Sequence, residues 1–189
     1  MKMKQLFNDQ RGFTLVEMLV VVAIMGIIAA GIAMTISQVM AVNSRTSSHM
    51  VALRQVQQAG DRVSKDVLQA RSIHPDPSSA TGFPLTLTIP YWGEDEDENP
   101  VELQLKVRYV LSDDNLQREY YGDGVINGGP DYTTTVARYI LSVHPDDVGN
   151  IMTSFGPAEE AGAYIFKVSA KVGARIETRE YEVRPRPGS

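Results

Sequence analysis

Cysteine is absent from this chain of 189 residues. Its absence excludes a disulfide framework, a thiolate metal site and a cysteine nucleophile. The sequence also lacks a dense basic patch, and its formal net charge is −5. Because a net negative charge repels phosphate backbones, broad nonspecific binding to nucleic acid is disfavoured, and no nucleic acid is expected as a partner.

Motifs of hydrolytic enzymes are also missing from the sequence. There is no nucleophile-elbow motif, and His49, His74 and His144 are scattered singly along the chain. The length and the apolar content of 43% allow one domain with a proper core plus an extra segment. The chain is therefore not expected to be an enzyme.

One long apolar run lies close to the N-terminus. It covers Phe13 to Ile36, and Glu17 is its only charged residue. At about 1.5 Å per residue, a helix of this length covers roughly 36 Å, which is enough to span a bilayer core of roughly 30 Å. Before the run, Lys2, Lys4 and Arg11 outnumber the single acid Asp9. Positive-inside bias therefore predicts a cytoplasmic N-terminus and an extracytoplasmic globular part.

Three interpretations compete for this run. A secretory signal peptide could be cut near residues 31–33, but its apolar region should have only about 7 to 15 residues and no acid. A plain membrane anchor fits the length and the flanking charges but leaves Glu17 unexplained. Because a charged group at mid-membrane is disfavoured by roughly 2.5 to 3.5 kcal/mol on insertion scales, such a residue usually marks a function.

The third interpretation accounts for Glu17. The stretch "GFTLVE", residues 12–17, follows a short basic leader and contains the first residues of the long apolar run. It resembles the prepilin processing motif of the bacterial type IV pilin and type II secretion pseudopilin family. The resemblance implies cleavage after Gly12, N-methylation of Phe13 and assembly through Glu17. We expect Glu17 to pair with the N-terminal amine of a neighbouring subunit, a contact that fixes register more than it adds stability.

The resemblance also implies partners and a location. The expected partners are a prepilin peptidase, other pilins or pseudopilins, an inner-membrane assembly platform, and membrane lipid before assembly. The chain is expected to cross the cytoplasmic membrane once and to join a cell-surface or periplasmic filament afterwards. No resident cofactor is implied.

Four segments are predicted along the chain: a leader at 1–12, a transmembrane and assembly helix at 13–36, an amphipathic continuation at 37–74, and an extracytoplasmic β-sheet domain at 75–189. The continuation is predicted from one apolar stripe at spacings of three, four and seven. The stripe consists of Val39, Val42, Met50, Leu53, Val56, Val63, Val67 and Ala70. Poor helix formers at 43–48 make a break plausible there.

After Pro77 the apolar period changes to two, which predicts half-buried strands. The six candidates are residues 85–89, 101–109, 116–121, 134–143, 164–172 and 175–183. Residues 172–174 are expected to form a tight hairpin turn. With no second long helix in the pattern, the predicted fold class is α+β: the back half of the long N-terminal helix packs on an antiparallel sheet.

Two further stretches look like the minor J-type or W-type subunits of this family. They are "DRVSKDVLQA" at 61–70 and "VRYVLSDDNLQRE" at 107–119, the latter ending in Leu116-x-Arg118. The leading hypothesis is therefore a structural, minor pilin or pseudopilin subunit. The alternative is a membrane-tethered binding, adhesin or DNA-uptake module displayed at a filament tip.

An acidic run, Glu94, Asp95, Glu96, Asp97 and Glu98, could gather calcium through several carboxylate oxygens. A run of this kind is more often a solvated loop. Gly26 and Gly31 within the apolar run are either close-packing points or soft spots of the helix.

Overall fold

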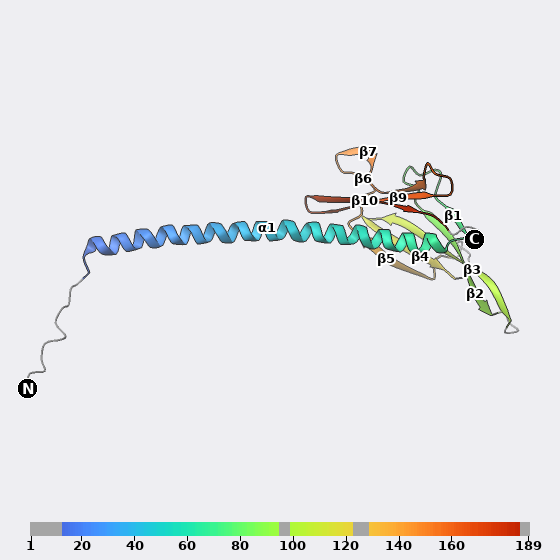
Figure 1. Cartoon of the computed structure of the whole chain (residues 1–189), viewed down its shortest axis with the longest axis horizontal. Helices are drawn as coiled ribbons and strands as arrows, with labels where there is room; N and C mark the ends of the chain where they lie inside the picture. Colours follow the sequence, from blue (N-terminus) through green and yellow to red (C-terminus); the bar gives the residue numbers. More distant parts are fainter. Residues whose placement is uncertain (1–12, 95–98, 123–128, 186–189) are drawn as a thin grey trace, which may run out of the picture. The chain divides into compact units, whose positions relative to one another are not determined.

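The computed structural model describes residues 13–94, 99–122 and 129–185. Within them the chain forms one long helix, α1 (Leu15–Gln69), followed by ten strands. Two compact units divide the chain, Met1–Arg45 and Thr46–Ser189. The second contains the end of α1 and all the strands, and Figure 1 colours these strands from green to red. The predicted α+β class is confirmed.

Helix α1 differs from the prediction at two places. Residues 43–48 are helical rather than broken, because the propensity cost of Asn, Ser and Thr is only up to about 0.7 kcal/mol per residue and no proline interrupts the segment. The helix also ends at Gln69, so the predicted continuation to residue 74 is wrong. The amide of Arg71 donates to the carbonyl of Thr88 at 2.8 Å, and this bond starts strand β1 (Ser72–His74).

The larger sheet is antiparallel and has five strands in the order β1-β2-β3-β4-β5. The bounds of the four that follow β1 are Leu85–Glu94 for β2, Pro100–Ser112 for β3, Asn115–Tyr121 for β4 and Tyr132–Arg138 for β5. Leu85 and Leu87 alternate with threonines and point into the core, as the period of two predicts.

The remaining strands form two smaller sheets. A three-stranded antiparallel sheet has the order β10-β9-β8, and β6 pairs with β7. Their bounds are Val143–His144 for β6, Asp147–Ile151 for β7, Ser154–Pro157 for β8, Tyr164–Val172 for β9 and Arg175–Val183 for β10. The predicted hairpin turn between β9 and β10 is present, with Gly173 at φ 60°.

The predicted strand at 134–143 is wrong beyond Arg138. Tyr139 takes a left-handed conformation with φ 62°, which a continuing strand cannot accommodate. The amide of the next residue, Ile140, donates to the carbonyl of Asp114 at 2.7 Å, and Ile140 bridges to Ala170 in β9. This turn carries the chain from the larger sheet to the three-stranded one.

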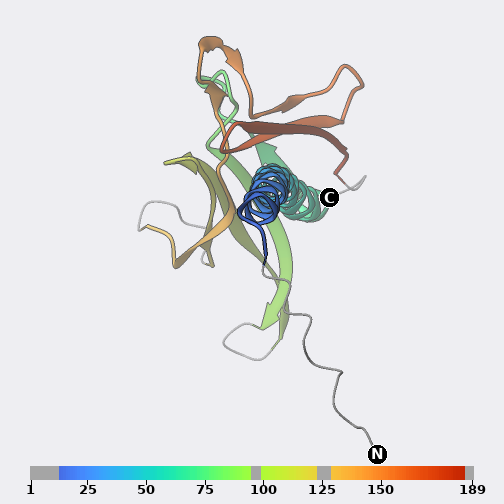
Figure 2. The same cartoon turned by 90° about the vertical axis from the view of Figure 1, so that its left-hand side faces the viewer.

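The core of the second unit lies around the back part of α1. In Figure 2 the helix is seen nearly end-on, with the β2–β5 strands on one side and β9 and β10 on the other. The buried helical residues recur at spacings of three and four: Ala52, Val56, Ala59, Gly60, Val63, Asp66 and Val67. Val39, Val42 and Met50 of the predicted stripe are exposed, so the buried part of the stripe begins only after them.

Candidate assembly site on the N-terminal helix

The start of α1 is fixed by a side-chain cap. Thr14 immediately precedes the helix, and its Oγ1 accepts a hydrogen bond from the amide of Glu17 at 3.3 Å. The spacing Thr14-x-x-Glu17 is that of a capping box, in which an acidic or amide residue at the third helical position complements the cap. A carboxylate in the first turn also interacts favourably with the helix dipole. Sequence reasoning missed this local role of Glu17, although the four-residue spacing signals it.

Two of the three residues predicted for processing and assembly, Phe13 and Glu17, lie within the described part of the chain. Phe13 lies just before the helix and is 75% exposed, and Glu17 is exposed one turn later. The two positions therefore lie at the same end of α1. Gly12, the predicted cleavage position, lies outside the described residues.

The surface of α1 on both sides of Glu17 is apolar and uncovered. None of residues 13–45 is buried, and Leu15, Val16, Leu19 and Ile27 are among its exposed apolar side chains. By length and composition this part of α1 is able to cross a membrane. An apolar surface of this extent needs lipid or other apolar helices to cover it.

Two hydroxyl groups of this part of α1 are already hydrogen-bonded, so lipid or an apolar helix can lie against them. Thr35 Oγ1 donates to the carbonyl of Gly31 at 2.9 Å, and Ser37 Oγ donates to that of Ala33 at 3.0 Å. Each hydroxyl is thus paired within its own helix. A Cβ at Gly26 or Gly31 would meet no atom of the chain within 4 Å, so neither glycine is required by an internal contact.

Other candidate residues do not gather into a site. Glu94 is exposed at the end of β2, and the rest of the acidic run, residues 95–98, lies outside the described residues. No cluster able to hold a metal occurs among the residues that are described, and the calcium site stays a prediction. His49 Nδ1 lies 2.6 Å from Glu177 Oε1, whereas His74 lies in β1 and His144 in β6.

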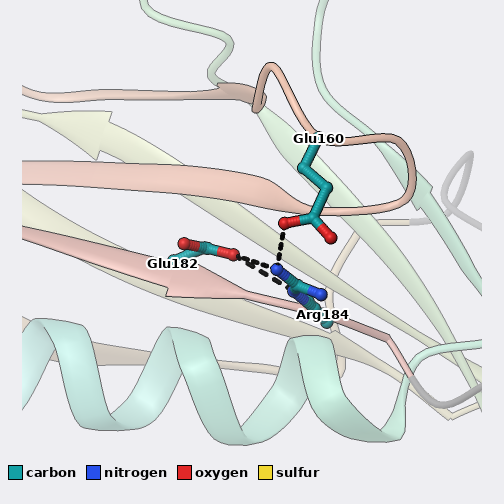
Figure 3. A network of polar contacts seen from close by, with 3 residues as sticks. All are labelled: Glu160, Glu182 and Arg184. Carbon is teal, nitrogen blue, oxygen red and sulfur yellow. Dashed lines mark hydrogen bonds and ion pairs between the residues drawn. The ribbon is translucent and has the colours of Figure 1, made fainter.

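An exposed network joins Arg184 to two carboxylates (Figure 3). Its guanidinium donates to Glu182 at 2.8 and 3.1 Å and also contacts Glu160. These hydrogen bonds, first that of Glu182 and then that of Glu160, raise the pKa of Arg184. Exposed ion pairs contribute little to stability, and arginine is charged in any case. The network therefore only connects the end of β10 with the loop before β9 at the surface.

A comparison with known protein families finds a match that covers the start of α1. The family described as the prokaryotic N-terminal methylation motif matches residues 7–33. The match contains Gly12, Phe13 and Glu17 together with most of the exposed apolar helix. No curated protein matches the chain.

The motif supports a type IV pilin-like or pseudopilin subunit. Such subunits are structural rather than catalytic. The motif implies processing by a prepilin peptidase and assembly with other pilin subunits, and together with the apolar helix it indicates membrane anchoring.

Proposed function

We propose that the chain is a minor pilin or pseudopilin subunit of a type IV pilus or a type II secretion-like filament. The observation that carries this proposal is the position of Glu17. It is the one charged residue between Phe13 and Ile36, and it lies in the first turn of an uncovered apolar helix within the methylation motif.

Processing prepares the subunit to leave the bilayer. A prepilin peptidase cleaves after Gly12, and the new amine on Phe13 is methylated. Cleavage removes Lys2, Lys4 and Arg11, the charges that hold the N-terminus in the cytoplasm. The helix can then be drawn out of the membrane by the assembly platform without pulling a charged segment through hydrocarbon.

Assembly replaces lipid with neighbouring helices. The exposed apolar side chains from Leu15 to Ile36 supply the packing surface, and Gly26 and Gly31 allow neighbouring backbones to approach closely. In this apolar surrounding Glu17 pairs with the amine of Phe13 in an adjacent subunit. The pair fixes the axial register between helices.

The minor J-type or W-type assignment rests on two stretches far apart in the sequence. Asp66 belongs to the first and Arg118 to the second, and Arg118 Nε donates to Asp66 Oδ2 at 2.7 Å inside the domain. We take this contact as support for the assignment, because it joins the two stretches that carry the resemblance.

The decisive experiment separates the two roles that Glu17 can have, capping its own helix and pairing with a neighbour. Glu17→Gln removes the charge and keeps a residue that suits a capping box, whereas Glu17→Val removes both. Both variants should be cleaved and membrane-bound, because neither change lies at the cleaved bond or adds a charge to the membrane. Both should be lost from sheared filaments, as measured by immunoblot of the sheared and membrane fractions.

Thr14→Ala serves as the matched control because it weakens the cap, by about 1 kcal/mol, and keeps the carboxylate. It should still enter filaments. If Glu17→Gln assembles like the unmodified chain and only Glu17→Val fails, the carboxylate acts as a cap and the proposed pairing with a neighbour is wrong.

A further inference from the structure

Strands β2 and β3 continue as a two-stranded ribbon beyond the rest of the sheet (Figures 1 and 2). β1 pairs with β2 only at residues 86–88, and β4 pairs with β3 only from Lys106 onwards. Residues 89–94 and 100–105 therefore pair only with each other among the described strands. An isolated two-stranded ribbon is marginally stable in water, so contact with a partner would stabilise it.

One face of this ribbon is aromatic and acidic. Trp92, the only tryptophan of the chain, is 74% exposed. It lies directly opposite Glu102 in the register and on the same face as Glu94. We call Trp92, Glu94 and Glu102 the ribbon patch. Glu102 forms an ion pair with Arg71 at 2.7 Å, so among the described residues of this face Glu94 is the main source of negative charge beside the indole.

A groove with complementary properties lies between α1 and β5, the edge strand of the same sheet. It has a volume of about 380 Å³, and its lining includes Gln58, Arg62, Tyr132 and Thr134, which we call the helix groove. This volume lies within the range of about 300 to 1,000 Å³ that is usual for ligand pockets, so the groove is large enough for one aromatic side chain such as Trp.

The helix groove carries positive charge at its helical wall. Arg62 is about half exposed and lies 3.8 Å from Asp66, and Arg54 and Lys65 flank it on the same surface of α1, with Asp61 as the one acid among them. Arg118, at the floor, is already bound to Asp66. Every buried side-chain polar atom of the described residues has a partner, so the groove has no unpaired buried group with which to hold a small ion.

We propose that the ribbon patch of one copy of this chain docks in the helix groove of a neighbouring copy. Trp92 enters the groove and stacks on the guanidinium of Arg62, a cation–π contact, and Glu94 faces Lys65. The charges of the two surfaces are opposite, which favours this pairing over two ribbons or two grooves meeting face to face.

The proposed contact joins two different surfaces, and this determines which type of assembly it can form. A heterologous contact leaves one ribbon patch and one helix groove free at the ends, so it extends into a ring or a helical filament rather than closing as a dimer. The inference rests on the proposed filament function. It requires at least two adjacent copies, which a less abundant subunit can also supply.

The natural absence of cysteine makes the test specific. Gln104→Cys places a thiol on the face of the ribbon that carries Trp92, and Thr134→Cys places one at the groove. The two full-length variants are produced together in the native host and treated with a short bifunctional thiol reagent. A crosslinked dimer is expected only when both variants are present, and Trp92→Ala in the Gln104→Cys chain should remove it.

Val148→Cys, exposed on β7, replaces Gln104→Cys as the control and should give no dimer with Thr134→Cys. A dimer from Gln104→Cys alone would mean that ribbons meet each other, and it would overturn the proposal. Filaments that form normally without the ribbon-to-groove dimer would also overturn it while leaving the proposed function intact. Absence of filaments, by contrast, would count against the proposed function.

Charge exchange tests the orientation of the contact. Glu94→Lys should reduce the crosslinked fraction about two- to five-fold, the range expected for one exposed ion pair. Pairing that chain with a Lys65→Glu copy should restore the fraction. Failure of the second change to compensate for the first would show that Glu94 does not face Lys65.

Discussion

Asp66 on α1 and Arg118 on β4 form a buried ion pair that ties the helix to the larger sheet. Arg118 Nε donates to Asp66 Oδ2 at 2.7 Å, and both residues are less than a tenth exposed. Tyr109 Oη on β3 donates to the same oxygen at 2.7 Å. One carboxylate thus fixes the helix against two neighbouring strands.

Loss of this carboxylate should destabilise the domain strongly. We expect Asp66→Ala to lower the free energy of unfolding by about 3 to 5 kcal/mol, because the buried guanidinium of Arg118 loses its counter-charge. The measurement is thermal unfolding of the full-length chain in detergent, followed by near-ultraviolet circular dichroism of the tyrosines.

Two further variants make the Asp66 prediction specific. Asp61→Ala removes an exposed acid from the same helix and should change stability by no more than about 0.5 kcal/mol. The double variant Asp66→Leu with Arg118→Met should recover much of the loss, since apolar residues can replace a buried pair. If Asp66→Ala proved as mild as Asp61→Ala, the pair would not hold the domain together.

Stability should fall at high pH because of Tyr109. Burial, and then the charge of Asp66 and the hydrogen bond to it, raise the pKa of the Tyr109 hydroxyl well above its usual value. The folded state therefore favours the neutral phenol, and its contribution is complete below the unfolded pKa of about 10 and is lost as pH rises above it. The slope is about 1.4 kcal/mol per pH unit for one group.

Tyr109→Phe tests this dependence. The variant should lose about 1 kcal/mol at neutral pH, the contribution of a hydrogen bond, and its stability should decline less steeply above pH 10. Burial also raises the pKa values of Tyr121 and Tyr181, so some dependence should remain. Unfolding midpoints measured from pH 8 to 11.5 provide the check, and parallel profiles for the two proteins would contradict the assignment.

Gly60 allows a tyrosine of β10 to lie against the helix. A Cβ at this position would fall 2.1 Å from Cζ of Tyr181, and the Tyr181 hydroxyl donates to the carbonyl of Val56 at 3.4 Å. Gly60→Ala should therefore destabilise the domain by about 1 to 3 kcal/mol through overpacking, despite the higher helix propensity of alanine.

The Tyr181→Ala background distinguishes a clash from a backbone effect. Without the ring, Gly60→Ala should become neutral or stabilising by up to about 1 kcal/mol, since only helix propensity remains. Thermal unfolding of the four proteins of this double-mutant cycle gives the coupling. An equal loss in both backgrounds would place the cause in the helix backbone rather than at Tyr181.

The purified chain should begin at N-methylated Phe13. The expectation follows from the match of residues 7–33 to the methylation motif and from Gly12 standing before Phe13. Intact-mass spectrometry of the membrane-extracted protein, with sequencing of its N-terminal peptide, is the measurement. A chain that retains Met1, or one that starts near Met34, would exclude this processing.

Local features of this protein could be predicted from its sequence because they depend on neighbouring residues. The apolar helix after Phe13 and the position of Glu17 need no tertiary contact, and a family motif covering residues 7–33 agrees with them. The strands that contain Leu85, Val107 and Tyr164 follow from alternation of polar and apolar side chains. These patterns were sufficient for the α+β class.

Long-range choices were decided only by the tertiary structure. The left-handed turn at Tyr139 separates two sheets where alternation predicted one long strand, and β1 forms only because β2 offers a free edge to Ser72–His74. The pairing of Asp66 with Arg118 and the approach of Tyr181 to Gly60 join positions more than fifty residues apart. Side-chain periodicity indicates which face of an element is buried but not which partner buries it, because that choice depends on the packing of the whole domain.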